Sequence, residues 1–250
     1  MELKQMIARL LLALLLLLAL PVHSAGPPLV VAVDNFSPPF VLRGANSQLY
    51  GFDIAMMENI CQRINRTCQY KPMPFNRLLD AVESGQAEAA VGSIIITSER
   101  LTQVNFSIPY LISESRFLGR TELAKEPFQL ALFKNRKIGV EEGTVFPDVL
   151  ASLISNPQIA LYDNLDDVIV ALHDGDIELA LMDAPTALYW QSQSSGTLTA
   201  LGKPFAYGFG LGVAVNRNNA VLLNEINRAI TDYAASEAFK SNYQKYMGFF

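Results

Sequence analysis

Metal-binding and basic residues are scarce in this sequence. Its 250 residues include only two Cys and two His, whereas a structural zinc site usually takes four such ligands. Lys and Arg number 19 against 24 Asp and Glu, without a basic stretch, which argues against nucleic acid as a partner. Hydrophobic residues make up 50% of the chain and charged residues 17%, so we expect a folded core. Neither a metal nor another cofactor is predicted.

Sequence signatures of common enzyme classes are also absent. The chain has no P-loop, no Gly-x-Ser-x-Gly turn and no His-Glu-x-x-His helix. A Gly208-x-Gly210-x-Gly212 pattern is present, but Val213–Val215 follows it as a strand, where a dinucleotide-binding turn requires a helix. The sequence therefore offers no motif for nucleotide binding or for hydrolysis.

The one long hydrophobic run lies near the start of the sequence. Leu10–Leu20 contains eleven apolar residues without a charge and follows a short positively charged segment. A membrane-spanning helix needs about 20 apolar residues, so the run is more typical of a secretory signal than of an anchor. We expect residues 1–24 to form a signal peptide, with cleavage after Ser24 or Ala25. The product should be a soluble exported protein.

The two cysteines are close in the sequence, with six residues between Cys61 and Cys68. An exported protein reaches an oxidising compartment, which favours a disulfide. The alternative, a redox-active pair, usually has two intervening residues. A structural disulfide between Cys61 and Cys68 is therefore predicted, and closing so short a loop stabilises a fold by about 2–3 kcal/mol.

Segments typical of strands and helices alternate along the chain, as in α/β proteins with mainly parallel sheets. Strands are expected at Leu29–Val33, Cys68–Met73, Ala87–Gly92, Lys137–Val140, Leu179–Met182 and Val213–Val215. Helices are expected at Asp53–Ile64, Phe75–Glu83, Pro147–Ile154, Leu165–Leu172, Ala184–Gln191 and Leu222–Ala235. No Pro-rich linker divides the chain, so the domain boundary must come from another feature.

An internal repeat indicates two similar halves. Leu78–Ser93 and Val168–Asp183 align without gaps, and four of the sixteen positions are identical. In each copy a predicted helix ends at a Gly and a strand follows; chance similarity between helix–turn–strand units is the alternative. Ser93 and Asp183 are equivalent, and each ends a strand. Because open α/β sheets bind ligands outside the carboxyl ends of strands, the two residues would face one ligand from opposite lobes.

Polar residues that suit ligand binding follow three predicted strands. Asp34 ends the first, where Asp also favours a simple turn. Arg100 would clamp a carboxylate, although taken alone it is more typical of a surface Arg paired with Glu99. Thr144 stands at a helix start after Glu141. A helix start suits an anion, but a plain helix cap is common.

Several segments, taken in order, carry a family likeness. They are Gly51–Ile54, Ile96–Arg100, Val104–Ser107, Pro109–Tyr110, Gly143–Thr144, Gly175–Glu178, Met182–Asp183 and Gly210–Val215. As a set they resemble the extracytoplasmic amino-acid-binding proteins of ABC importers, solute-binding protein family 3, over essentially the whole mature chain. The spacing of Cys61 and Cys68 resembles the members that bind arginine, lysine or histidine.

This resemblance implies a two-lobe α/β fold with a hinge and a ligand in the cleft, each lobe a mainly parallel sheet flanked by helices. The first lobe would comprise residues 25–112 and 210–250, and the second residues 113–209. The implied protein is periplasmic, is not an enzyme, and delivers a cationic L-amino acid, arginine first, to a membrane permease. We also expect a monomer. The alternative is an enzyme on the same scaffold, such as a periplasmic cyclohexadienyl dehydratase.

The resemblance assigns roles at the amino-acid end of the ligand. Arg100 would bind the ligand carboxylate, together with the backbone N–H of Val145, which follows Thr144. Asp183 would bind the α-ammonium, with Ser93 beside it. One positive and one negative side chain thus match the two charges that every α-amino acid carries.

Other residues match positions near the ligand side chain. Phe75 would pack on it, and Asp34 and Glu141 lie near its end. These two acids are left over once Arg100 and Asp183 are satisfied, and burying them against an apolar ligand would cost several kcal/mol. A guanidinium has five donors in a planar fork and can donate hydrogen bonds to both acids, so arginine is the expected ligand.

The sequence departs from the family pattern at two of these positions. Ile95 stands where the family usually has a Ser or Thr whose hydroxyl binds the ligand, so a hydrogen bond worth about 0.5–1.5 kcal/mol is lost or replaced. Ser37 stands where a Tyr often covers the ligand, and Phe36, one residue earlier, would substitute for it. Both departures affect the details of the pocket more than the class of ligand.

Overall fold

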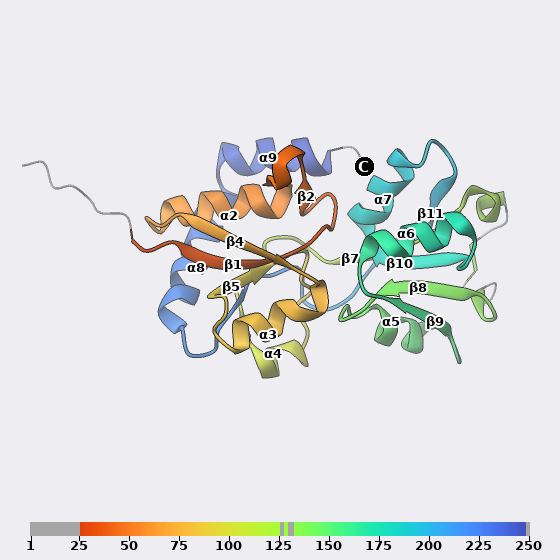
Figure 1. Ribbon diagram of the computed structural model, residues 1–250, viewed down its shortest axis with the longest axis horizontal. Coiled ribbons are helices and arrows are strands. Elements are labelled where there is room, and N and C mark those ends of the chain that lie inside the picture. The colour runs from red at the N-terminus through yellow and green to blue at the C-terminus, as the bar shows by residue number, and fades with distance from the viewer. Residues whose placement is uncertain (1–25, 126–127, 130–132, 249–250) are drawn as a thin grey trace, which may run out of the picture.

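The computed structural model describes residues 26–125, 128–129 and 133–248, which form two lobes side by side (Figure 1). The predicted signal peptide, residues 1–24, and its cleavage site after Ser24 or Ala25 lie outside the described residues. Among the helices that the structure describes, none is both long and apolar enough to cross a membrane. Each lobe has a five-stranded sheet flanked by helices.

The first lobe has a sheet with the strand order β4-β1-β5-β12-β6. These strands are β4 (Cys68–Met73), β1 (Leu29–Asp34), β5 (Ala89–Val91), β12 (Ala214–Val215) and β6 (Asn105–Phe106). β1 pairs in parallel with β4 and β5, whereas β12 is antiparallel to β5 and β6. The almost wholly apolar sequence of β1 is explained by its place between two strands, where nearly all of its residues are buried.

Helices cover both faces of this sheet (Figure 1). They are α2 (Phe52–Arg63), α3 (Leu78–Glu83), α4 (Arg100–Gln103), α8 (Ala220–Ala234) and α9 (Glu237–Met247), with the short turns η1 (Ala45–Ser47) and η2 (Phe75–Arg77) and the hairpin β2 (Leu42–Arg43) and β3 (Leu49–Tyr50). α2 buries Phe52, Met56 and Ile60, spaced four residues apart, and packs against α8 and α9. A disulfide joins Cys61 in α2 to Cys68 at the start of β4, which confirms the predicted pairing.

The second lobe has a sheet with the order β11-β7-β10-β8-β9. Its strands are β7 (Glu114–Arg120), β8 (Lys137–Glu141), β9 (Gln158–Tyr162), β10 (Leu179–Asp183) and β11 (Leu198–Ala206). Its helices are α5 (Phe146–Leu153), α6 (Leu165–Asp174) and α7 (Ala184–Gln193), with the turn η3 (Thr121–Lys125). β8 is parallel to β9 and β10, and β7 is antiparallel to β10 and β11.

The two-lobe α/β fold is thus confirmed, and each sheet is mixed. In each sheet two strand pairings are parallel and two are antiparallel. The parallel pairings join strands connected through helices, as the alternating pattern predicts. The antiparallel pairings involve β6, β7, β11 and β12, which lie at or next to the two places where the chain passes between the lobes.

The internal repeat corresponds to one structural unit present in both lobes. Glu88 and Glu178, identical in the alignment, stand just before β5 and β10. The Glu88 carboxylate accepts a hydrogen bond from the backbone N–H of Val30 in β1 (3.2 Å), and that of Glu178 accepts one from Lys137 in β8 (2.8 Å). β1 pairs with β5 and β8 pairs with β10. The two Glu residues therefore fix equivalent strand pairs, which argues against chance similarity.

The chain passes between the lobes twice, through residues 107–113 and 207–213. The two segments are hydrogen-bonded to each other; the backbone N–H of Tyr110, for example, donates to the carbonyl of Leu211 (2.9 Å). Such a paired connection is the position expected for a hinge. The lobe limits expected from the sequence, after residues 112 and 209, fall within these segments and stay a prediction.

Candidate functional site

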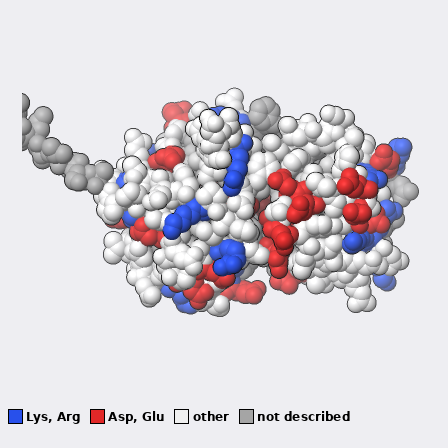
Figure 2. Space-filling model, in the orientation of Figure 1, with Lys and Arg blue, Asp and Glu red and all other residues white. Residues whose placement is uncertain are grey.

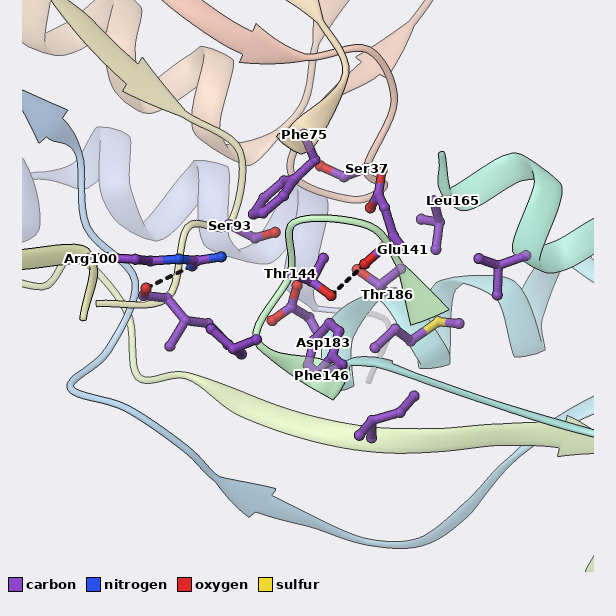
Figure 3. Close-up of a pocket in the computed structure, with 15 residues that line it drawn as sticks. Ser37, Phe75, Ser93, Arg100, Glu141, Thr144, Phe146, Leu165, Asp183 and Thr186 are labelled. Atoms are coloured by element: carbon purple, nitrogen blue, oxygen red, sulfur yellow. Dashed lines mark hydrogen bonds between the residues drawn. The ribbon is translucent and has the colours of Figure 1, made fainter. Parts of the chain in front are cut away.

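A cavity lies between the lobes and is lined by residues of both. It lies where three strands end: Ser93 closely follows β5, Glu141 ends β8 and Asp183 ends β10. Both halves of the internal repeat therefore reach the same cavity, as their equivalent positions predict. Figure 3 shows these side chains together.

Most of the predicted site residues line this cavity. They are Phe75, Ser93, Ile95 and Arg100 from the first lobe, and Glu141, Thr144, Val145 and Asp183 from the second. Asp34 and Phe36 do not line it, whereas Ser37 does. The fold thus brings distant parts of the sequence together, and the ligand contacts assigned to these residues stay a prediction.

Arg100, the first residue of α4, is buried between the lobes rather than on the surface. Its guanidinium donates to the carbonyl of Ile95 (2.9 Å) and, across the lobes, to the carbonyl of Gly143 (2.8 Å). It also lies over the ring of Phe75, 5.5 Å from the centroid. Burial lowers the pKa of Arg100 to about 10, so the group is charged at neutral pH. Two of its five donors are used, which leaves three for an anion.

Ser93 is held in position by a buried acid that the sequence analysis did not single out. Asp53 accepts hydrogen bonds from the backbone N–H of Ser93 (2.8 Å) and from the hydroxyl of Tyr110 (2.9 Å). Burial raises the pKa of Asp53 to about 6, and these hydrogen bonds oppose the rise. The only signal in the sequence was its place in the family-like segment Gly51–Ile54.

Asp183 lies between the two lobes, and it has a free oxygen for a ligand. Its Oδ1 has no hydrogen-bond partner in the part of the chain that the structure describes. Burial raises the pKa of Asp183 to about 7, and the charge of Asp53 adds to the rise, whereas Ser93 and Arg100 lower it. A cation next to Asp183 would restore the ionised form, because it compensates the lost hydration.

Glu141 is the most strongly perturbed acid of the cavity. It is 7% exposed, and its pKa is raised to about 9 by burial and then by the charges of Asp34, Asp183 and Asp166, while the backbone N–H of Leu165 lowers it. Its Oε1 has no partner among residues 26–125, 128–129 and 133–248. A buried carboxyl oxygen without a partner is costly, so this position suits a cationic ligand group.

Asp34 stands next to the cavity without lining it. One of its oxygens accepts the backbone N–H of Asn35 (2.7 Å), within its own turn, and the other has no partner among the described residues. Burial raises the pKa of Asp34 to about 6. Asp34 therefore combines a role in the turn that ends β1 with a charge that Glu141 experiences.

Two side chains of the predicted site make contacts that their loop positions did not indicate. Thr144 does not cap α5: its hydroxyl donates to the carbonyl of Glu141 (2.6 Å), and the helix begins after Val145 without a side-chain cap. Phe36 does not lie in the cavity lining, because its ring packs edge-on against Trp190 of the second lobe, with 6.3 Å between the centroids. A loop position alone does not tell which way a side chain points.

The second lobe also supplies cavity residues that the sequence analysis missed. Apolar walls come from Phe146, Leu165, Val168, Leu181 and Met182, and a further hydroxyl comes from Thr186. These residues are ordinary members of α5, α6, β10 and α7, so nothing in their sequence distinguishes them from core positions. Apart from its charged groups, the cavity therefore has a mostly apolar lining.

The lobes touch each other beside this cavity. The side-chain amide of Asn76 donates to the carboxylate of Glu142 (2.9 Å), near the Arg100–Gly143 hydrogen bond. Gly143 has φ +79°, and an added Cβ would lie 2.5 Å from the Cα of Asn76. Only glycine fits there, because both the backbone angle and the close approach exclude a side chain.

The family model for bacterial extracellular solute-binding proteins, family 3, matches residues 29–249 of this chain. The chain belongs to this family. This confirms the resemblance carried by the sequence motifs, and it makes the cavity between the lobes the expected solute site of a solute-binding protein.

Individual relatives agree with this assignment. The arginine-binding periplasmic protein of Mannheimia haemolytica is 28% identical over 225 residues, which cover 88% of this solute-binding protein and 91% of the relative. A periplasmic binding protein of an arginine transport system from Legionella pneumophila has a similar structure, with TM-score 0.81, 28% identity and coverage of 88% and 100%. An ancestral amino-acid-binding protein, a precursor of cyclohexadienyl dehydratase, has TM-score 0.79 at 21% identity, covering 88% and 95%, and shows the fold alone.

Proposed function

We propose that this protein captures an L-amino acid with a cationic side chain, arginine first, in the periplasm and delivers it to the membrane permease of an ABC transporter. The observation that carries the proposal is the charge of the cavity. One buried cation, Arg100, faces three acids with raised pKa values: Asp183, Glu141 and the adjacent Asp34. An α-amino acid satisfies Arg100 and one acid, and a cationic side chain satisfies the others.

The shape and the polarity of the cavity support the same ligand. Phe146, Leu165 and Val168 provide apolar surface for a methylene chain, while Glu141 supplies a carboxylate beside it. A long side chain that ends in a cation therefore matches the lining from one end to the other. A guanidinium offers five donors, and an ammonium three.

The surrounding charge also favours a cation. Residues 138–202 include ten Asp and Glu and no Lys or Arg. Figure 2 shows acidic side chains gathered on the second lobe beside its junction with the first. A surface of one sign raises the local concentration and association rate of ligands of the opposite sign. The arginine-binding relatives support the choice of arginine within this class.

Calorimetric titration with arginine, lysine, histidine, glutamine and glutamate tests the proposal. We expect arginine to bind most tightly, then lysine, with glutamine and glutamate weaker. Tighter binding of glutamine or glutamate than of arginine would overturn the charge count. The family membership would stand in that case, and only the class of ligand would change.

One observation keeps catalysis as a second candidate. An enzyme on this scaffold needs an acid with a raised pKa in the cleft, and Glu141 meets that condition. We favour binding, because an acid with one unpartnered oxygen next to Asp34 and Asp183 is equally well explained by a cationic ligand. Incubation with prephenate, arogenate and cationic amino acids, followed by product analysis, distinguishes the two. Turnover of any of them would replace binding by catalysis.

A further inference from the structure

Besides Oδ1 of Asp183, three buried oxygens of the cavity have no hydrogen-bond partner among the described residues. They are Oγ of Ser37, Oε1 of Glu141 and Oγ1 of Thr186. The three residues line the same cavity and are only 5%, 7% and 2% exposed. Buried polar groups are usually hydrogen-bonded, because leaving one unsatisfied destabilises the fold. Three such oxygens around one cavity indicate a ligand group that donates to all of them.

Neither hydroxyl group makes a hydrogen bond within its own element. Thr186 is the third residue of α7, a position where a hydroxyl often bonds the backbone of the first turn, but no such bond forms here. The backbone of Ser37 is satisfied by Val41, whose carbonyl accepts its N–H (2.9 Å) and whose N–H donates to its carbonyl (2.9 Å). The Ser37 hydroxyl lies close enough to the Asp34 carboxylate to lower the pKa of that acid, but it has no partner at hydrogen-bond geometry among the described residues.

The three oxygens come from both lobes and lie away from Arg100, the residue predicted to bind the ligand carboxylate. Ser37 belongs to the first lobe, and Glu141 and Thr186 belong to the second. Figure 3 shows the three on the side of the cavity away from Arg100 and next to apolar Leu165. This end of the cavity therefore has several hydrogen-bond acceptors next to an apolar side chain, whereas the other end contains the Arg100 guanidinium.

We infer that Ser37, Glu141 and Thr186 form a subsite for a planar guanidinium, in which Thr186 determines the preference for arginine over lysine. The inference rests on the proposed function and deepens it. A guanidinium directs its N–H groups along two edges of one plane, so one edge reaches Glu141 and Thr186 while another reaches Ser37 across the cleft. The ammonium of lysine is a compact point charge whose three donors radiate from one nitrogen, so we expect it to satisfy Glu141 without also reaching the Thr186 hydroxyl.

The substitution Thr186→Val removes the hydroxyl and keeps the branched shape, and Thr186→Ser, which keeps the hydroxyl, is the matched control. Hydrogen bonds to charged groups are strong enough that we expect Thr186→Val to weaken arginine binding about tenfold or more. Lysine binding should change by less than about threefold, and Thr186→Ser should stay close to the unaltered protein. Titration calorimetry measures both ligands, and fluorescence of Trp190, the one Trp of the chain, with circular dichroism checks the fold.

The ratio of the two affinities decides the outcome. An equal loss for arginine and lysine, or no loss for arginine, would overturn the guanidinium subsite while leaving the proposed function intact. If the unaltered protein fails to bind arginine at all, the proposed function fails as well. Should Thr186→Val not fold, Ser37→Ala makes the same test from the opposite lobe: it must lower arginine binding more than lysine binding, or the subsite is refuted.

Discussion

Binding of a cationic amino acid should release protons from this protein. The pKa of Glu141 is raised to about 9, so at pH 7 the carboxyl of the ligand-free protein is protonated in about a hundredfold excess. A ligand cation beside it favours the ionised form and lowers its pKa. Glu141 therefore holds its proton in the free protein and loses it in the complex. The affinity for the cationic amino acid must then rise with pH between the pKa of Glu141 in the complex and its pKa of about 9 in the free protein.

The structure sets the size of this effect. At pH 7 the solution is about two pH units below the Glu141 pKa of about 9. Removing the proton from Glu141 at this pH therefore costs about 2.7 kcal/mol, which reduces the binding free energy by that amount. If the complex holds the pKa below 6, the affinity for arginine rises about thirtyfold between pH 6 and pH 7.5. Asp183, with a pKa of about 7, adds to the release where it meets the α-ammonium, so we expect between one and two protons per ligand at pH 7.

Titration calorimetry at pH 7 in phosphate and in Tris measures the release directly. The two buffers differ in ionisation enthalpy, so the difference in observed enthalpy gives the number of protons exchanged. Glu141→Gln should release about one proton fewer and flatten the rise of affinity with pH. Equal enthalpies in the two buffers, together with an affinity that does not change between pH 6 and pH 7.5, would refute the reasoning.

Two further substitutions test the other main features. Arg100→Ala should weaken amino-acid binding about 30- to 5,000-fold, because it leaves the ligand carboxylate without its charge partner; calorimetry measures the loss, an unchanged melting curve shows that the fold remains, and near-normal affinity would contradict the assigned role. Replacing both Cys61 and Cys68 by Ser should lower the free energy of unfolding by about 2–3 kcal/mol in a denaturant titration, with arginine affinity unchanged. A loss of binding in that variant would show that the disulfide shapes the site.

Much of the fold could be predicted because it follows from local pattern. The parallel strands other than β9, which the sequence did not indicate, alternate with their helices in a clear apolar pattern, and the repeat predicted that Ser93 and Asp183 lie at one site, where both line the same cavity. β7 was missed because Glu114–Arg120 carries three charged residues in a strand of seven. β11 was missed because it contains Gly202, with φ +65°, and Pro204, near a shift of register. Both strands are stabilised by distant antiparallel partners, which a local pattern does not show.

For the site, the sequence predicted which charged residues take part but did not predict which way individual side chains point. The charged residues Arg100, Glu141 and Asp183 were predictable because the family resemblance matched them to ligand-binding positions, whereas Arg100 taken alone is more typical of a surface residue. The direction of Phe36 and the hydroxyl of Thr186 were not, since each depends on how α7 of one lobe faces the other. Contacts between lobes are settled by tertiary packing alone.

The place of β12 in the first sheet has a consequence for how the protein is made. β12 lies between β5 and β6, yet the whole second lobe separates it from them in the chain. During synthesis the second lobe has all its strands once residue 206 has been added. At that point the first lobe still lacks β12, the strand that pairs with both β5 and β6. Unpaired strand edges invite pairing with other chains. The lobe that starts first is therefore finished last, and the nascent chain carries an open sheet for the time taken to add about a hundred residues.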